Sequence, residues 1–265
     1  MCIRDRCGRQ ELMIPVVVLQ TIAANLGSML TPIGNPQNLY LHGLAGTGIG
    51  EFIMWLLPYT IASALLLVIS ILLIKNKNEI ICIEDTDSEA AHNTSVPRVM
   101  AYSVLFVLAL LVVARVLTWY ILAAAVLITV LLLEKNVLAK ADYALLLTFI
   151  GFFIFTGNMG RVEPVAHFLA GIVNGWELEA GIITSQCISN VPAALLLSEF
   201  TDNIKNLAIG VNIGGLGTLI ASMASLISYK LYANEVPEKK GKYFAAFTVY
   251  NIIFLVVLYV FTKLI

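Results

Sequence analysis

The sequence predicts an all-α, polytopic membrane protein, and three observations support this prediction. Of the 265 residues, 59% are hydrophobic and only 12% are charged, whereas about a quarter of the residues in a soluble domain are charged. Uncharged apolar runs recur along the chain, several of them close to the roughly 20 residues that a helix needs to cross a bilayer. Two of these runs are interrupted by polar and glycine-rich breaks. The net charge of −1 gives no attraction to nucleic acid, so the expected partner of this apolar surface is the lipid bilayer.

The apolar runs divide the chain into two parts joined by a charged linker. The first part, 1–74, contains an interrupted helix over 12–45 and a span over 52–74. The linker, 75–98, is acidic and is expected to be a solvated cytoplasmic segment. The second part, 99–265, contains the remaining elements: spans over 99–114, 118–133, 143–158 and 243–262, a helix plus a re-entrant hairpin over 164–200, and an interrupted helix over 206–229. A re-entrant hairpin is tolerated only where its tip is buried in protein or lines a cavity.

The basic residues predict the orientation of these spans. Twelve of the 16 Lys and Arg residues fall in the N-terminal segment and in the loops near 75–98, 134–142 and 230–242. Loops that are rich in Lys and Arg stay on the cytoplasmic side. We therefore expect a multi-pass protein of the cell (inner) membrane, with the hairpin around Asn190 entering from the opposite side.

The two interrupted helices resemble each other in sequence. At an offset of 187 residues, five of the sixteen positions in 24–39 are identical to those in 211–226, and Asn25 lies opposite Asn212. The predicted orientation makes the two copies run in opposite directions. Interrupted helices at corresponding places of an inverted repeat are typical of secondary transporters. Small residues that allow close helix packing would explain the glycines of the breaks, but not the two prolines of the first break, which remove backbone hydrogen bonds.

The polar groups inside the breaks are neutral. No Asp, Glu, Lys or Arg falls deep inside a predicted span, although proton relays usually carry such a residue. Backbone N–H groups at a helix N-terminus attract anions, and the carbonyls freed by a break suit a small hard cation. A cation beside an anion also lowers the cost of burying either charge. The pattern favours sodium-coupled transport of a small anion, and the chain has neither the HExxH nor the GxSxG motif of an enzyme.

Three motifs resemble those of a known group of proteins. Ser-Asn-Val-Pro-Ala-Ala at 189–194, followed by Asn-Ile-Gly-Gly-Leu-Gly-Thr at 212–218, resembles the second-half signature of the ion transporter superfamily. Thr-Pro-Ile-Gly-Asn-Pro-Gln-Asn at 31–38 resembles the corresponding first-half element. Within the superfamily, the sequence is most similar to the citrate-transporter-like, divalent anion:sodium symporter group, from about residue 12 to residue 265.

This resemblance implies two inverted repeats, each with a hairpin and an interrupted helix that meet at the midplane. It also implies an elevator-type movement of these elements against a scaffold, and it leaves open a homodimer through the scaffold helices. The substrate would be a small anion such as citrate, with sodium as the coupling ion and no other cofactor. The residues assigned to the substrate are Ser189, Asn190, Val191, Thr218, Asn35, Asn38 and Thr31. Those assigned to sodium are Ser189, Asn190, Asn212, Gly214, Gly215, Gly217, Asn25, Gly27 and Gly34.

The sequence departs from the family pattern in two places. Dicarboxylate members typically carry a threonine after the Ser-Asn pair, where this chain has Val191. No Ser-Asn tip precedes Asn25, so we expect the first-repeat hairpin to be missing and the chain to lack its N-terminal part. Two alternatives stay open: an arsenite or sodium/proton carrier of the same superfamily, and a truncated fragment without function.

Overall fold

A computed structural model of the chain describes residues 10–74, 96–140, 143–159 and 161–265. The described residues form α-helices and short 3₁₀ turns, with no β-strand among them. The predicted linker lies outside the described residues, except that 96–98 open a helix instead. The prediction of an all-α, polytopic membrane protein is confirmed.

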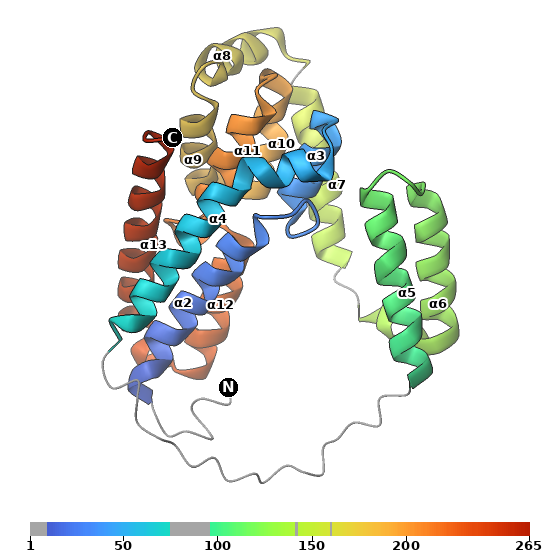
Figure 1. Ribbon diagram of the computed structural model, residues 1–265, viewed down its shortest axis with the longest axis horizontal. Coiled ribbons are helices and arrows are strands. Elements are labelled where there is room, and N and C mark those ends of the chain that lie inside the picture. The colour runs from blue at the N-terminus through green and yellow to red at the C-terminus, as the bar shows by residue number, and fades with distance from the viewer. Residues whose placement is uncertain (1–9, 75–95, 141–142, 160) are drawn as a thin grey trace. The chain divides into compact units, whose positions relative to one another are not determined.

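Four helices of the described chain are long and apolar enough to cross a membrane (Figure 1). They are α4 (Ile49–Leu72), α5 (Val96–Val113), α6 (Trp119–Ala139) and α13 (Lys240–Thr262), the last together with the 3₁₀ turn before it. The other helices are α2 (Gln10–Ser28), α3 (Pro36–Ala45), α7 (Tyr143–Met159), α8 (Glu163–Val173), α9 (Glu177–Ile188), α10 (Asn190–Leu197), α11 (Ile204–Ile213) and α12 (Met223–Glu235). Each interrupted helix therefore consists of two separate helices, α2 with α3 and α11 with α12.

The chain forms two compact units, which are described separately. The first comprises Met1–Ile83 and Ile154–Ile265, and the second comprises Glu84–Phe153. In the second unit α5 packs against α6, and Arg98 forms an ion pair with Glu134 at 3.2 Å. No side chain of α5 is buried, as expected for a helix whose apolar side chains face lipid.

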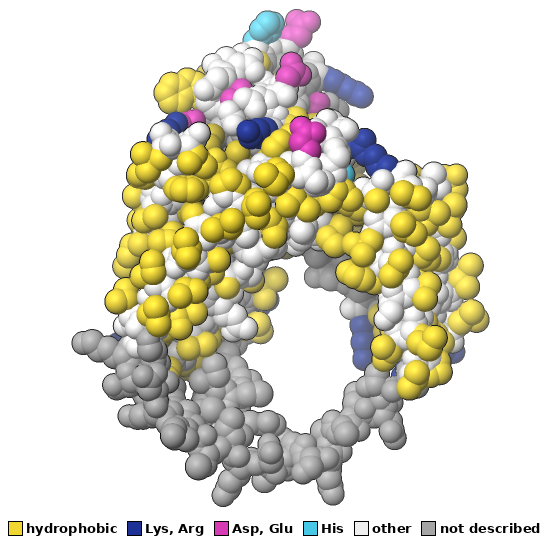
Figure 2. Space-filling model, viewed as in Figure 1, with side chains coloured by type: hydrophobic (Ala, Val, Ile, Leu, Met, Phe, Trp, Pro, Cys, Tyr) yellow, Lys and Arg dark blue, Asp and Glu magenta, His cyan; other side chains and the backbone are white. Residues whose placement is uncertain are grey.

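The first unit contains both interrupted helices and the hairpin. Its α2 packs against α4, α12 and α13, while α9 packs against α10 and α11. Side chains from these helices, including Ile22, Phe52, Leu207 and Phe247, form one buried apolar core. Apolar side chains also cover the outer faces of α4 and α13, and charged ones gather at the end where α13 finishes (Figure 2).

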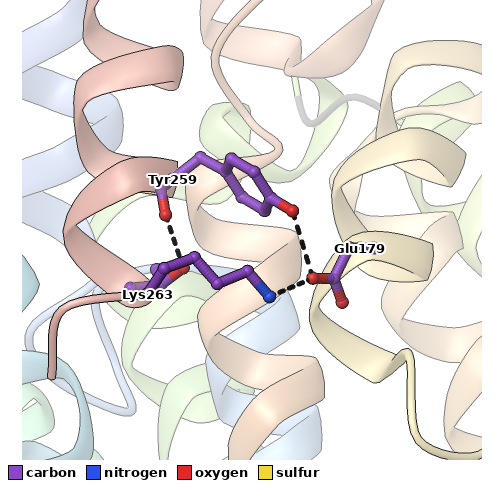
Figure 3. A network of polar contacts seen from close by, with 4 residues as sticks. Glu179, Tyr259 and Lys263 are labelled. Carbon is purple, nitrogen blue, oxygen red and sulfur yellow. Dashed lines mark hydrogen bonds and ion pairs between the residues drawn. The ribbon is translucent and has the colours of Figure 1, made fainter.

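A polar network ties the end of α13 to the start of α9 (Figure 3). Glu179 accepts hydrogen bonds from the Lys263 Nζ at 2.5 Å and from the Tyr259 hydroxyl at 3.2 Å. Burial raises the pKa of the Glu179 carboxyl, but the hydrogen bonds it accepts and the charge of Lys263 outweigh burial and leave this pKa below its ordinary value of 4.5. The same partner raises the pKa of Lys263 above 10.5. The network therefore stabilises the fold most at neutral pH.

We expect Glu179→Gln to remove the part of the folding stability that depends on the ionised Glu179 carboxylate. A carboxyl whose pKa is lower in the folded protein stabilises the fold at pH values above its unfolded pKa, and this stabilisation is lost as the pH falls through the folded pKa. The wild-type melting temperature should exceed that of the variant at pH 7, and the difference should shrink below pH 4.5. Melting curves of both proteins in detergent between pH 7 and pH 3 measure this. A difference that is constant across the range would contradict the assignment.

Candidate functional site

The first break separates α2 from α3 and is held by the side chains of two asparagines. Asn35 is the N-cap of α3, and its Oδ1 accepts from the backbone N–H of Asn38 at 2.9 Å. The Asn38 Nδ2 donates to the carbonyl oxygens of Met29 at 2.7 Å and Thr31 at 3.3 Å. An asparagine amide therefore replaces part of the hydrogen bonding that the break removes. Pro36 follows the cap at the first helical position, where its missing N–H costs nothing.

The second break separates α11 from α12 and ends in the same kind of cap. Ser222 is the N-cap of α12, and its Oγ accepts from the backbone N–H of Ser225 at 3.1 Å. The offset of 187 residues found in the sequence places Asn35 opposite Ser222 and Asn38 opposite Ser225. The equivalent residues therefore cap the helix after each break in the same way.

The two broken helices bond to each other reciprocally. Asn212, before the second break, accepts from the Asn35 Nδ2 at 3.0 Å and donates to the Asn38 Oδ1 at 2.6 Å, both after the first break. Asn25, before the first break, donates to the hydroxyls of Ser222 at 2.9 Å and Ser225 at 3.4 Å, both after the second break. The residues before each break thus contact those after the other break.

The hairpin tip lies against the second break. Ser189 joins α9 to α10 with φ 76° and ψ 153°, a backbone conformation that is rare outside glycine and that often occurs at functional sites. Its hydroxyl lies 3.5 Å from the carbonyl oxygen of Ala221. The Asn190 side chain is 6% exposed, and it forms no hydrogen bond with any described residue. Gly215 approaches it closely, since a Cβ at Gly215 would lie 2.9 Å from the Asn190 Nδ2.

The structure brings most of the predicted residues to this place, but not all of them. Asn25, Asn35, Asn38 and Asn212 form the reciprocal network, while Ser189, Asn190, Gly214, Gly215, Gly217 and Thr218 lie at the contact between the hairpin and the second break. Gly34 is part of the first turn, where a Cβ would lie closer than 2 Å to the Ser28 carbonyl oxygen, so only glycine fits. Thr31 contributes its carbonyl, and Val191 is buried in α10. Gly27 belongs to α2, and a Cβ there would meet nothing within 4 Å.

Two residues of α9 that the sequence did not single out also belong to the site. The Ser185 side chain is fully buried, donates to the Gly181 carbonyl at 2.6 Å, and would lie 2.9 Å from a Cβ at Gly214. Gln186 forms hydrogen bonds to three residues of the second break. A polar residue every few positions is ordinary on a helix, so neither residue stands out in the sequence.

An all-α fold with membrane-length helices, two broken helices and a polar hairpin tip defines a multi-pass membrane protein of transporter type. Residues 6–205 match the profile of the citrate transporter family. This match covers most of the chain, and the chain belongs to that family. Membership points to transport rather than to catalysis.

Two relatives agree with this assignment. An uncharacterized transporter of Methanocaldococcus jannaschii, MJ0456, is 36% identical over 250 residues, which cover 94% of this chain and 66% of the relative. The inner membrane protein YbiR of Escherichia coli is 30% identical over 241 residues, which cover 84% of this chain and 60% of the relative. The chain therefore spans slightly less than two thirds of the length of each of these relatives.

Proposed function

We propose that this chain forms the substrate and cation site of a secondary active transporter of the inner membrane. The observation that carries this proposal is the reciprocal bonding of Asn25 and Asn212 across the two broken helices. Inverted repeats of transporters place their ligands where such breaks meet. The proposed substrate is a small anion, a di- or tricarboxylate such as citrate, which accords with the name of the family.

The proposed coupling ion is sodium, because the second break offers neutral oxygen atoms. Along 214–218, the carbonyl oxygens of Gly215 and Gly217 accept no hydrogen bond from any described residue. The Asn190 side-chain amide lies beside Gly215, and the Ser189 Oγ lies beside the carbonyl of Ala221, three residues after this segment. Neutral oxygens of this kind suit a hard monovalent cation, and the described residues place no carboxylate among them. The equivalent first-half group is Asn25 with Gly27 and Gly34.

The anion would be bound next to this cation by N–H groups and hydroxyls. The helix N-termini at Asn35 and Ser189 carry partial positive charge, and Thr31, Asn38, Asn190, Val191 and Thr218 complete the proposed contacts. Burying the anion beside the cation costs less than burying either alone. Coupling follows because each ion improves the site for the other.

Transport would follow the elevator scheme, and the division into two units supports it. The first unit holds both broken helices and the hairpin, while the second holds α5, α6 and most of α7. A unit that carries both broken helices and the hairpin as one packed body is suited to moving as a whole. We propose that the second unit acts as the scaffold, and that its lipid-facing helices also form the contact of a homodimer.

Uptake into proteoliposomes tests this function. We expect labelled citrate or succinate to accumulate with an inward sodium gradient and not with an equal choline gradient. Asn190→Ala should reduce sodium-driven uptake at least tenfold, because it removes the amide that lies open beside Gly215. Asn234→Ala, an exposed amide near the end of α12, is the matched control and should leave uptake unchanged.

Several results would overturn the proposal. Arsenite uptake without carboxylate uptake, or sodium flux driven by a pH gradient alone, would assign the chain to another activity of the superfamily. Carboxylate uptake that is the same with sodium and with choline would remove the sodium coupling. Full uptake by the Asn190→Ala protein would exclude the hairpin tip from the site.

A further inference from the structure

Gln186 bonds to three residues of the second break at once. Its Nε2 donates to the carbonyl oxygens of Gly214 at 2.8 Å and Leu216 at 2.9 Å. Its Oε1 accepts from the backbone N–H of Thr218 at 2.9 Å, and its own carbonyl accepts from the Thr218 hydroxyl at 3.2 Å. One side chain therefore supplies the partners that the unwound backbone between α11 and α12 would otherwise lack.

These bonds divide the carbonyl groups of the break into two sets. The carbonyls of Gly214 and Leu216 are engaged by Gln186, while those of Gly215 and Gly217 accept nothing from the described residues. The segment approaches the Gln186 side chain closely, because a Cβ at Gly217 would lie 2.3 Å from the Gln186 Oε1. Gly217 also has φ 104°, a conformation that favours glycine. The side chain of Gln186 thus fixes which carbonyls remain open.

The same helix carries the hairpin tip. Ser189 and Asn190 follow Gln186 by three and four residues, so about one helical turn separates Gln186 from the hairpin tip. On the N-terminal side of Gln186, the backbones of α9 and α11 lie in contact, since a Cβ at Gly181 would lie 3.0 Å from the Val211 backbone nitrogen. A shift of 214–218 relative to α9 would therefore move the open carbonyls away from Asn190.

We propose that Gln186 is a positioning residue that holds the open carbonyls of Gly215 and Gly217 in register with the Ser189–Asn190 tip, so that both form one cation site. The role rests on the proposed sodium-coupled function. Gln186 itself does not bind the cation, because its amide oxygen and nitrogen are both used by the break. Its loss should therefore weaken sodium binding while the tip residues stay intact.

Two substitutions in the full chain test the role. Gln186→Met keeps the length of the side chain but provides no hydrogen bond, and it should raise the half-saturating sodium concentration for uptake about tenfold, which corresponds to about 1.4 kcal/mol. Gln186→Glu keeps the acceptor for Thr218 but turns an ionised oxygen toward two carbonyls at pH 8. It should raise that concentration at least as much. The introduced carboxyl is half-buried and faces two carbonyl oxygens, which raises its pKa above the ordinary value of about 4.3. At pH 5.5 a protonated fraction therefore donates to one of the carbonyls, so sodium affinity should partly recover.

The pH-dependent recovery separates positioning from a general loss of stability. Gln186→Met should show no recovery, and wild-type protein measured over the same range corrects for the titration of other groups near α9. These groups include Glu177, Glu179 and Cys187 on α9 itself, Glu163 and His167 on α8, Glu199 after α10, Lys205 on α11, and Tyr259 and Lys263 at the end of α13. Melting temperatures of all three proteins establish that they are folded under the assay conditions.

The possible results are distinct. If both variants keep a half-saturating sodium concentration within twofold of wild type, the positioning role is wrong even though sodium coupling stands. If Gln186→Glu is no better at pH 5.5 than Gln186→Met, hydrogen bonding to the carbonyls is not the cause of the defect. If wild-type protein itself shows no sodium-dependent uptake, the proposed function has failed first. Should Gln186→Glu not fold at pH 8, the Met variant alone decides the sodium affinity.

Discussion

Replacing Asn212 by leucine is expected to destabilise the protein by about 2 kcal/mol or more, because a buried polar group that loses its partner costs about 1–3 kcal/mol. Asn212 is 3% exposed and serves Asn35 and Asn38 as well as the carbonyl of Ala208. Leucine has a similar volume but leaves the Asn38 Oδ1 without its donor inside the protein. Sodium-driven uptake should fall below a tenth of the wild-type rate, since the two breaks lose their common contact.

A second buried asparagine provides the control. Asn251, in the middle of α13, is fully buried, and its Nδ2 donates to the carbonyl of Phe247 one turn earlier. Its Oδ1 finds no hydrogen-bond donor among the described residues. Asn251→Leu should therefore be neutral or stabilising, because it removes a polar atom that is already unsatisfied. Denaturant unfolding of both variants in detergent micelles measures the difference. Equal losses would mean that the reciprocal network contributes no more than an ordinary buried amide.

The pairing between Asn35 and Asn212 can be measured directly. A double-mutant cycle with Asn35→Ala and Asn212→Ala should give a coupling energy near the upper end of the range for interhelical hydrogen bonds in membranes, about 0.6 kcal/mol on average and about 1.7 at most. Because Asn212 also serves Asn38, the coupling to Asn35 alone accounts for only part of the loss on replacing Asn212.

The sequence was sufficient to predict where the helices break. Pro36 and the Gly-Gly-Leu-Gly run after Ile213 cannot continue a helix at low cost, and the breaks occur at both. The alignment of Asn25 with Asn212 also anticipated equivalent positions, because local chemistry and an internal repeat can both be read along one chain. The Ser-Asn tip was expected for the same reason, since a polar pair followed by proline interrupts an apolar run.

The contacts between the breaks could not be predicted in this way. Gln186 reaches Gly214 and Leu216 across 28 and 30 residues, and Glu179 reaches Lys263 across 84. Such pairs depend on how α9 lies against α11 and α13, and helical periodicity does not fix that arrangement. The family resemblance assigned Gly214 and Gly215 alike to sodium, whereas in the structure the Gly214 carbonyl accepts a hydrogen bond from Gln186 and the Gly215 carbonyl accepts none from the described residues. Only the packed structure separates the two glycines.

Gly210→Ala is expected to have the second largest effect, because it forces α9 and α11 apart. A Cβ at Gly210 would lie 2.4 Å from the carbonyl oxygen of Leu178 and 2.8 Å from its Cα, and both atoms belong to backbone that no rotamer change can move. Overpacking of this kind typically costs about 1–3 kcal/mol. The hairpin that carries the tip rests on this contact, so sodium-driven uptake should fall at least tenfold together with the melting temperature.

A graded series distinguishes helix separation from the ordinary effect of removing a glycine. At Gly181 on the facing helix, the closest backbone atom would be 3.0 Å from the new Cβ, so Gly181→Ala should be damaging but less so than Gly210→Ala. Gly241, near the start of α13, has nothing within 4 Å of a new Cβ. There, Gly→Ala should be neutral or stabilise by about 0.4–1 kcal/mol, since it restricts only the unfolded chain. If the losses do not follow this order, the close approach of α9 and α11 is not what holds the hairpin tip against the second break.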